Sequence, residues 1–544
     1  MDDWAGVSLG HAPATDDGLW HGRPRPEDER YLSEPVVVPK VQRSTRAVMG
    51  LLLVAAIVYG GFVLAPWRHG DWVPYVALVV AEAILLGNAV AMWWTGLFGD
   101  DELWESPEVH AFRHDLISGV STPTVDVIIT VYGEPLDVIT RTVRAARDMR
   151  LAHNVYVCDD GRSDAIRDLC THLGVGYLRR DDRRGVKAGN ANRALARTHG
   201  DYVAIFDADH AAHPDFLVVA LPHLARPEVA FVQCSQAYRT DNGNFIEIAA
   251  AQSQQVFYEV ICPGKNRFNA AFHVGTNAVF RRTALDDVNG FYEDTHSEDI
   301  WTSIRLHQRG WTSVYLPHIL ARGLSPDTLD SHFRQQFRWA SGSFEILLRS
   351  NPLQAAGLSP GQRLQYFTPP LHFLQGFSNL WFLLLPPLFL LFGITPLETD
   401  SSTWLTLFLP FWILTQAVLW MQSGGLRLRP VVLSVASAPV HVRAFFAVLF
   451  RRKPVWRSTR AAGAIPSVVE VTLPQIVLLA INVAGIVVGV STIENVTGTA
   501  ICVALSLIHV LILSRVIAQA VADRWRARRR PAPAAAPRPA GVAA

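Results

Sequence analysis

Six long apolar segments divide the chain, two ahead of a central region and four behind it. Each holds about 20 residues or more, which is enough for a helix to cross the hydrocarbon core of a bilayer. The segments occupy residues 47–67, 72–98, 368–394, 403–421, 470–490 and 500–521. We therefore predict three pairs of transmembrane helices, in residues 47–98, 366–422 and 468–521.

The segments between and beyond these spans are more polar. Residues 1–46 are rich in Pro, Asp, Glu and Arg, which predicts a disordered cytosolic segment. Because the first apolar segment begins only after it, we interpret that segment as a membrane anchor and not as a secretory signal. Residues 423–467 mix prolines and basic residues with apolar ones, which favours an interfacial helix followed by a loop. Residues 522–544 are basic and then Ala/Pro-rich, which predicts a disordered tail.

Basic residues gather on one side of the predicted spans. They stand before the first span, between the fourth and fifth, and after the sixth, and include Lys40, Arg43, Arg46, Arg451, Arg452, Lys453, Arg524 and Arg526. The loops on the opposite side carry few cations. The positive-inside rule then places both termini and the central region in the cytosol.

The central region, residues 99–365, has a different pattern. Short apolar runs at 126–131, 154–158 and 202–206 indicate buried strands, and helix-like segments such as 136–150 lie between them. Alternating strands and helices predict an α/β domain with a mostly parallel sheet. Ligands bind such sheets beyond the carboxyl ends of the strands.

Composition narrows the function classes. The 544 residues are half apolar and carry a net charge of +1, so the charge balance does not favour nucleic-acid binding. The five cysteines are scattered without paired spacing, which disfavours a zinc ribbon or a disulfide framework. This usage fits a domain in a reducing, cytosolic compartment.

Two aspartates follow the third of these strands. Asp207 and Asp209 alternate around Ala208, which lets their carboxylates converge at the strand end. Hard oxygen ligands of this kind hold Mg²⁺ or Mn²⁺, and such an ion neutralises a diphosphate leaving group. A pair of solvated loop aspartates is the alternative, and the other motifs nearby favour the metal site.

Asp159, Asp160 and Gly161 follow the second of these strands. The two carboxylates are placed to bond the base or ribose of a nucleotide, although Asp and Gly are also common in plain turns. Lys187 stands close to Gly189, which lets the backbone approach a ligand. We interpret Lys187 as a nucleotide contact in preference to an ordinary surface lysine.

A third acidic motif, Ser297-Glu298-Asp299, opens a predicted helix. A carboxylate near a metal site can take the proton of an attacking hydroxyl, and direct attack with one such base inverts the anomeric carbon of a sugar. We therefore predict Asp299 as a general base. The alternative is a pair of acids stabilised by the helix dipole.

Gln335, Arg338 and Trp339 have the spacing of one helical face. The guanidinium suits a diphosphate, and the indole offers an apolar plane for the C–H face of a sugar ring. A buried helix with a core tryptophan would give the same spacing. The position of this motif downstream of the acidic residues favours the functional interpretation.

In their order and spacing these motifs resemble the processive glycosyltransferases of family 2, the group that includes bacterial cellulose, hyaluronan and chitin synthases. The resemblance covers roughly residues 46–521. It implies a cytosolic GT-A domain, which is Rossmann-like α/β, inserted in an all-α transmembrane channel of about six helices. It also implies the plasma (inner) membrane of a bacterium as the location.

The resemblance assigns roles to individual residues. Nucleotide-binding positions of the family are matched by Thr130, Tyr132, Asp159 and Lys187. Asp207 and Asp209 match the diphosphate and metal positions, and Asp299 matches the base. Gln335, Arg338 and Trp339 match the motif of processive members, in which the tryptophan lies below the acceptor sugar.

Neighbours of these motifs complete the predicted substrate site. They are Asp160, His210, Glu298, and Gly275 and Thr276 of a segment that resembles the acceptor motif of the family. In that segment His273 and Val274 depart from the family pattern. Trp456 to Arg460 resembles a gating loop that covers the donor, which adds Thr459 and Arg460.

These observations favour a UDP-sugar-dependent inverting hexosyltransferase that polymerises a β-linked polysaccharide and moves it across the membrane. UDP-glucose is the first donor and UDP-N-acetylglucosamine the second. The expected partners are the donor, the nascent polymer, the bilayer and accessory export subunits, and no nucleic acid. Two alternatives stay open: a non-processive transferase that adds one sugar to a lipid, and a binding or transport protein that has lost catalysis.

Several polar residues fall inside the predicted spans, where they are costly if they face lipid. They are Glu82, Asn88, Gln416, Glu470 and Asn482. Either they bond the hydroxyls of a glycan in a channel, or they bond neighbouring helices.

Overall fold

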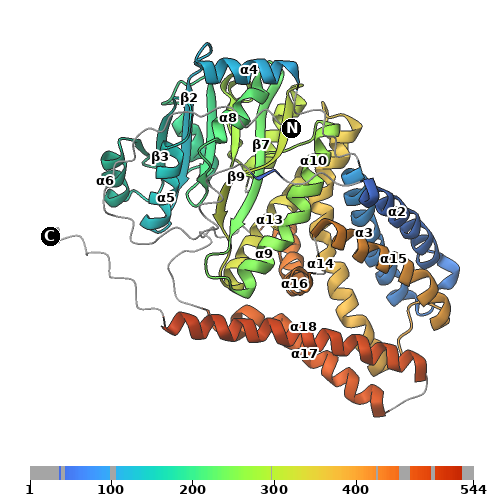
Figure 1. Cartoon of the computed structure of the whole chain (residues 1–544). Helices are drawn as coiled ribbons and strands as arrows, with labels where there is room; N and C mark the ends of the chain where they lie inside the picture. Colours follow the sequence, from blue (N-terminus) through green and yellow to red (C-terminus); the bar gives the residue numbers. More distant parts are fainter. Residues whose placement is uncertain are drawn as a thin grey trace.

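The computed structural model describes residues 43–97, 106–295, 297–423, 425, 427–451, 466–491 and 496–529, together with the short strand at 36–37. In these residues a mixed α/β domain lies beside a group of long helices (Figure 1). The chain passes from two long helices into the domain and then back into long helices. The predicted α/β domain flanked by apolar helices is confirmed.

The domain is built on one nine-stranded sheet with the order β1-β9-β7-β8-β5-β2-β3-β4, and β6 pairs with β9. The strands are β1 (Val36–Val37), β2 (Val125–Val131), β3 (Asn154–Asp159), β4 (Gly176–Arg179), β5 (Tyr202–Asp207), β6 (Ala211–Ala212), β7 (Val229–Arg239), β8 (Ala278–Arg281) and β9 (Thr312–Leu324). Strands β2, β3, β4 and β5 run parallel, as predicted. Strand β8 runs antiparallel between β5 and β7, so the sheet is mixed.

Strand β2 shows why the centre of the sheet forms. All seven of its residues are buried. Val127 and Ile129 belong to the apolar core on one face, and Ile128 belongs to the core on the other. Continuous apolar runs of this type are typical of parallel strands covered on both faces. The register pairs Val131 with Asp159, so β2 and β3 end together at one edge.

Short helices cover this sheet. They are α4 (Pro107–Ser118), α5 (Leu136–Arg147), α6 (Asp164–Leu173), α7 (Val186–Leu195), α8 (Phe216–Ala220), η2 (Leu221–Leu224), α11 (Arg282–Asp287) and α12 (Glu298–Gln308). In α5 the buried residues Ile139, Val143 and Ala146 follow helical spacing, and charged residues occupy the opposite face. This amphipathic pattern docks the helix on the sheet.

A second group of helices lies between the sheet and the long helices (Figure 1). It consists of α9 (Phe245–Val256), the π-helix η3 (Phe257–Ile261), α10 (Cys262–Lys265), η4 (Asn266–Phe268), α13 (Leu329–Ser350) and η5 (Pro352–Gln354). Helix α9 contacts β7 on one side and the long helices on the other. This layer therefore connects the two parts of the molecule.

Seven of the described helices are long and apolar enough to cross a membrane. They are α2 (Arg43–Val63), α3 (Trp72–Leu97), α14 (Pro360–Phe392), α15 (Ser401–Ser423), α16 (Leu428–Leu449), α17 (Val468–Ser491) and α18 (Val496–Arg529), and the turn η1 (Pro66–Arg68) follows α2. Six of the seven coincide with predicted spans. Large apolar side chains such as Ile57 and Leu511, each 70% exposed, point outward from them. Exposed apolar surface on this scale is typical of helices in contact with lipid.

Helix α16 is the seventh candidate, and it falls in the segment predicted to lie at the cytosolic interface. It packs on α9 and α13, which belong to the domain, and on α14 and α18. Leu433 and Ala436 of α16 share one apolar cluster with Ile246 of α9 and Phe333 of α13. The interfacial position stays a prediction, because its length and composition also fit a crossing helix.

Two of the polar residues inside the spans bond neighbouring helices. Glu82 of α3 accepts a hydrogen bond from the Tyr59 hydroxyl of α2 at 2.7 Å. Asn482 of α17 donates through Nδ2 to the carbonyl oxygen of Leu383 in α14 at 3.1 Å. For these two side chains the contacts favour helix–helix bonding over contact with a glycan.

A buried lysine fastens the domain to the long helices. Lys265 is 1% exposed and donates to the backbone oxygen and to Oε1 of Gln365 in α14, both at 2.9 Å. Gln365 in turn donates to the Thr95 hydroxyl of α3 at 2.8 Å. Gly264 permits this approach, because a Cβ there would lie 2.1 Å from the Thr95 carbonyl oxygen. Burial lowers the pKa of Lys265 to about 8.

Candidate active site

A cavity of about 340 Å³ lies at the carboxyl edge of the sheet. Its lining includes many residues singled out in the sequence: Thr130, Tyr132, Asp160, Lys187, Asp207, Asp209, Gly275, Glu298, Asp299, Arg338 and Trp339. They come from the ends of β2, β3 and β5, from helices α7, α12 and α13, and from the loop before β8. The fold thus gathers into one cavity motifs that are far apart in the chain.

Lys187 lines this cavity and contacts several of its other residues. Its ammonium donates to the carbonyl oxygen of Gly275 at 2.6 Å, contacts the carboxylate of Asp207, and lies 3.9 Å from Glu298. Burial lowers the pKa of Lys187, but the charges of Asp207 and Glu298 outweigh burial, and the net shift is upward. The lysine therefore carries a fixed positive charge into the site.

Asp207, Asp209 and His210 place their ligand atoms within 4.8 Å of one another. Asp209 accepts from the backbone N–H of Leu324 at 3.2 Å, and its other oxygen lies 2.9 Å from Nδ1 of His210. His210 is buried, and its Nε2 lies 3.1 Å from the amide nitrogen of Gln236. Because both ring nitrogens have partners, the imidazole orients Asp209, and the two carboxylates supply the oxygen ligands. That donor set fits a hard divalent cation.

Asp299 stands in the first turn of α12 and faces the same cavity. One of its oxygens accepts from the backbone N–H of Ile300 at 2.8 Å, which leaves the other directed at the cavity. Burial and, after it, the negative charge of Glu298 raise the pKa of Asp299 to about 7. A carboxylate with this pKa takes and releases protons near neutral pH.

Helix α13 brings an aromatic side chain and a cation to the cavity. Arg338 and Trp339 line it, and Trp339 also packs against the apolar cluster of Ala340 and Phe344. Gln335, one turn earlier, is directed elsewhere, because its Nε2 donates to the Tyr238 hydroxyl at 2.9 Å. Of the predicted motif, Arg338 and Trp339 therefore line the cavity, and Gln335 does not.

Comparison with known proteins agrees with this geometry. A family profile described as "Glycosyl transferase family group 2" matches residues 202–421. The UDP-forming cellulose synthase catalytic subunit of Pseudomonas fluorescens (strain SBW25) is 38% identical over 279 residues, and the corresponding subunit of Xanthomonas axonopodis pv. citri (strain 306) is 37% identical over 262 residues. These matches identify a glycosyltransferase family 2 domain in residues 202–421.

The sequence alignments and the structural match cover different shares of the chains. The alignments cover 50% and 47% of this chain, and 38% and 36% of the two relatives' own length. Among solved structures, a mannosyltransferase from Pyrobaculum calidifontis in complex with GDP-Man and Mn²⁺ matches with a TM-score of 0.50 and 18% identity. That match covers 69% of this chain and 100% of the mannosyltransferase, and it supports the GT-A-like fold.

Some of the predicted site residues shape the cavity from behind it. Asp159 is fully buried, and its carboxylate accepts from the backbone N–H groups of Gly161 and Ser163, each at 2.7 Å, and from the Tyr177 hydroxyl at 3.0 Å. The Thr276 hydroxyl accepts from the backbone N–H of Asp207 at 3.0 Å. Asp159 orders the loop after β3 and Thr276 fixes the end of β5, and direct ligand contact by either stays a prediction.

Asp160 lines the cavity but is also held in a buried ion pair. Both of its oxygens accept from the guanidinium of Arg180, at 2.6 and 2.7 Å. Its contact with a base or ribose stays a prediction. Thr459 and Arg460 of the predicted gating loop lie outside the described residues.

Two residues that line the cavity were missed in the sequence. Glu134 follows the end of β2, its Oε2 accepts from the backbone N–H of Tyr132 at 2.7 Å, and burial raises the pKa of Glu134 to about 7. Arg183 donates to the Tyr132 hydroxyl at 2.8 Å and lies 4.9 Å from the centre of its ring. The rule that ligands bind beyond strand ends could have found Glu134. Arg183 lies in a charged loop that gives no such signal.

Proposed function

We propose that this protein is a membrane-embedded, UDP-sugar-dependent inverting glycosyltransferase that polymerises a β-linked polysaccharide, with UDP-glucose as the leading donor. The observation that carries the proposal is the convergence of Lys187, the Asp207/Asp209 pair, Asp299 and Trp339 in one cavity. The relatives named as UDP-forming cellulose synthase subunits support the donor and the product class.

The diphosphate of the donor is held by fixed positive charge. Lys187 and Arg338 line the cavity from different helices and are placed to bind phosphate oxygens. Asp207 and Asp209 would hold Mg²⁺ or Mn²⁺, which supplies Lewis-acid stabilisation of the leaving diphosphate. Tyr132, with Arg183 over its ring, offers a flat surface for the base.

Transfer then needs a proton acceptor. The acceptor hydroxyl loses its proton to the free oxygen of Asp299 and attacks the anomeric carbon of the donor. The bond from that carbon to the diphosphate breaks, the electron pair leaves with UDP, and the new glycosidic bond has the opposite configuration. An α-linked donor thus gives a β-linked product, and Asp299 releases its proton to water.

The position of the cavity beside the long helices supports processive synthesis and export. Trp339 presents an indole on which an acceptor sugar can rest, and α13 packs against α14 and α16. In this proposal the polymer passes among these helices across the plasma membrane of a bacterium, with the catalytic domain and both termini in the cytosol. The predicted gating loop covers the donor, and accessory subunits receive the product.

The test uses membranes from cells that express the full chain. They are incubated with Mg²⁺ or Mn²⁺ and either UDP-glucose or UDP-N-acetylglucosamine, and UDP release and product size are measured. We expect a polymer from one of the two donors. A product of one or two sugars on lipid would replace the proposal with a non-processive transferase, and no turnover of either donor would reject it.

The pKa of Asp299 predicts the pH dependence of this reaction. A general base acts only when it is deprotonated. We therefore expect kcat/KM to reach its maximum above a pH of about 7 and to fall by about tenfold for each pH unit below it. Because the charge of Glu298 contributes to the raised pKa, Glu298→Gln should shift the midpoint to lower pH. An unchanged midpoint in Glu298→Gln, measured by UDP release over pH 5 to about 9, would contradict the assignment of Asp299.

Gly275→Ala tests how tightly the cavity is packed. Gly275 has φ of +93°, and a Cβ there would lie 3.4 Å from both Lys187 Nζ and Asp299 Oδ2. We expect backbone strain to lower the free energy of unfolding by about 1–2 kcal/mol. We also expect the added methyl group to weaken UDP binding. Gly310→Ala is the matched control, because Gly310 has φ of +88° and open space around it. Thermal unfolding should show a similar loss of stability in both variants. UDP titration should show a weaker affinity only in Gly275→Ala.

A further inference from the structure

The lysine that fastens the domain to the long helices, Lys265, is buried without an opposite charge. Its ammonium donates to the backbone oxygen and Oε1 of Gln365, both at 2.9 Å, and to the Thr368 hydroxyl at 3.2 Å. These partners are neutral, and within the described ranges no carboxylate acts on the charge of Lys265. A buried ammonium is costly when no opposite charge accompanies it, so a neutral side chain would pack here more favourably. The charge therefore indicates a role beyond packing.

The surroundings of Lys265 fit its protonated form. Three oxygens accept from it, and an ammonium has three N–H donors. A neutral amine keeps two donors, so one of these oxygens would lose its bond and face the nitrogen lone pair. The Phe272 ring, whose centre lies 5.2 Å from Nζ, attracts a cation. Loss of the proton would therefore weaken the contacts with both α14 and Phe272.

Phe272 opens a segment that reaches the cavity of the candidate active site. We call residues 272–276 the support segment. Near its end, the carbonyl oxygen of Gly275 accepts from the Lys187 ammonium at 2.6 Å. The Thr276 hydroxyl accepts from the backbone N–H of Asp207 at 3.0 Å. A shift of the support segment would therefore move groups that are placed to bind the donor.

The support segment is also bonded to α12 and lies close to α14. The backbone N–H of His273 donates to the Ser303 hydroxyl at 2.8 Å, and that hydroxyl donates to the carbonyl oxygen of Asp299 at 2.8 Å. Three residues ahead of the segment, the carbonyl oxygen of Asn269 accepts from Gln362 of α14 at 2.8 Å. The segment therefore lies between a long helix and the helix that carries the predicted base.

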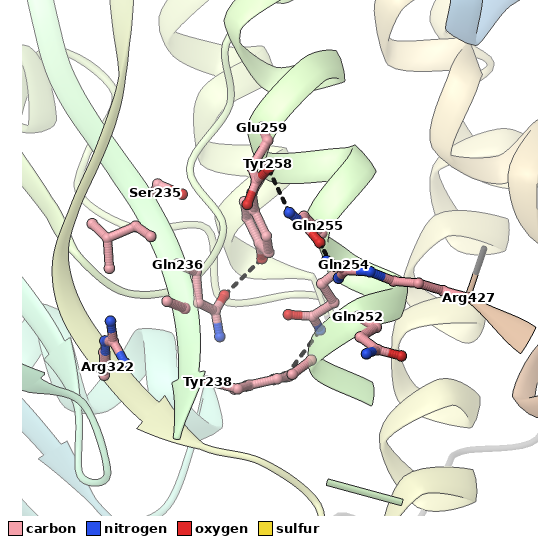
Figure 2. A pocket seen from close by; sticks show the side chains of 13 residues that line it. Ser235, Gln236, Tyr238, Gln252, Gln254, Gln255, Tyr258, Glu259, Arg322 and Arg427 are labelled. Carbon is pink, nitrogen blue, oxygen red and sulfur yellow. Dashed lines mark hydrogen bonds between the residues drawn. The ribbon is translucent and has the colours of Figure 1, made fainter. Parts of the chain in front are cut away.

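The titratable side chains around α10 leave Lys265 without a counter-charge. They are Tyr258 and Glu259 of η3, Cys262 of α10, Arg267 of η4, Tyr315 of β9 and Tyr366 of α14, and α3 carries none after Glu82. Figure 2 shows Tyr258 and Glu259 among the side chains that line a separate cavity, where Glu259 accepts from Gln255 at 2.8 Å. Ionisation of Cys262 would act on Lys265, but burial raises the pKa of that thiol to about 12. Burial therefore sets the pKa of Lys265, at about 8.

We propose that Lys265 is a positioning residue of the donor site. Its protonated side chain holds the support segment against α14, so that the last two residues of the segment keep Lys187 and Asp207 in place. Loss of the proton releases the segment, which weakens nucleotide binding and slows sugar transfer. This inference rests on the proposed function, because it takes the cavity at the carboxyl edge of the sheet as the donor site.

The experiment follows UDP affinity and UDP release from UDP-glucose and UDP-N-acetylglucosamine over a pH range of about 6 to 10. It uses the purified full chain in detergent with Mg²⁺. In the unaltered chain both quantities should fall above a pH of about 8. Gln365→Glu places a carboxylate beside Lys265, which raises the pKa of the lysine, so the fall should move upward by about one pH unit or more.

Lys265→Met removes the group that titrates. UDP affinity should then be weaker and transfer about 10–100-fold slower, the effect of a small misplacement of binding groups, and neither should fall further as the pH rises past 8. Arg267→Met is the matched control, because it removes an exposed cation two residues further along the chain. Both of its pH profiles should match those of the unaltered chain.

Thermal unfolding separates release of the segment from loss of the fold. The pKa of Lys265 lies below the ordinary lysine value of about 10.4, so the unfolded chain binds the proton more tightly than the folded chain does. Folding stability should therefore gain from Lys265 as the pH rises from about 8. UDP affinity that falls in this range without a matching fall in the midpoint of unfolding supports a positioning role.

The outcomes distinguish this inference from the proposed function. If a donor is turned over but neither profile falls above a pH of about 8, or Gln365→Glu leaves the fall in place, the assignment of Lys265 is wrong and the proposed function stands. If UDP affinity follows the expected shifts but neither donor is turned over, the assignment stands and the proposed function fails. If UDP binds at no pH, both fail. The unaltered chain and Gln365→Glu decide the question even where Lys265→Met does not fold.

Discussion

Asp299→Asn is expected to reduce the rate of sugar transfer by about 10²–10⁴-fold, the contribution typical of a general base. The substitution keeps an oxygen that can accept from the backbone N–H of Ile300, so the start of α12 should remain intact. It also leaves Lys187 with the carboxylates of Asp207 and Glu298. UDP should therefore bind as before while kcat falls. UDP titration measures the binding, and the rate of UDP release from the donor measures kcat.

Asp294→Asn serves as the control for this prediction. Asp294 is an exposed acid in the loop ahead of α12, so its substitution should change neither quantity. If Asp299→Asn retained a normal kcat, another group would have to take the proton. Glu298 would be the next candidate, because it lines the same cavity.

The strands that the sequence predicted best are those buried on both faces. The predicted runs 126–131, 154–158 and 202–206 differ from β2, β3 and β5 by one residue at most at each end. Local apolar runs suffice there because the core covers both sides of each strand. The antiparallel insertion of β8 between β5 and β7 could not be predicted, since it depends on pairing between distant segments.

Hydropathy located the spans but not the ends of the helices. Helix α14 begins at Pro360, ahead of the predicted 368, because its first turns hold polar residues such as Gln362 that bond the domain. Helix α18 continues to Arg529, past the predicted 521, with a polar last segment. A hydropathy pattern detects only the part of a helix that is apolar.

In the candidate site, the motifs predicted which residues lie near the cavity better than they predicted which side chains point into it. Lys187, Asp207 and Asp299 were singled out one motif at a time, and the fold brings them to one cavity. Asp159 and Gln335 belong to equally clear motifs, yet their polar atoms bond other protein groups. Which way a side chain points depends on partners elsewhere in the chain, such as Tyr177 and Tyr238.

Asp209→Asn is expected to weaken binding of Mn²⁺ by about 100-fold or more and to lower kcat/KM by a similar factor, since even residues behind the metal ligands are usually worth about 10–100-fold. The amide keeps the size of the side chain but loses its charge and one acceptor oxygen. In this structure both oxygens are used, one by the Leu324 N–H and one by His210, so the substitution also frees one of these donors. Electron paramagnetic resonance of Mn²⁺ with the full chain in detergent measures the affinity directly.

The matched control for the metal site is Asp201→Asn at the opposite end of β5. Asp201 accepts from the backbone N–H and the hydroxyl of Thr124 at 2.9 and 2.7 Å, so this substitution disturbs a comparable carboxylate far from the cavity. It should leave Mn²⁺ affinity unchanged. Because the loss in Asp209→Asn is one of affinity, raising the Mn²⁺ concentration should restore part of the transfer rate. Normal Mn²⁺ binding in Asp209→Asn would place the ion on other ligands, and an activity that excess Mn²⁺ cannot raise would show that Asp209 acts on the substrate itself.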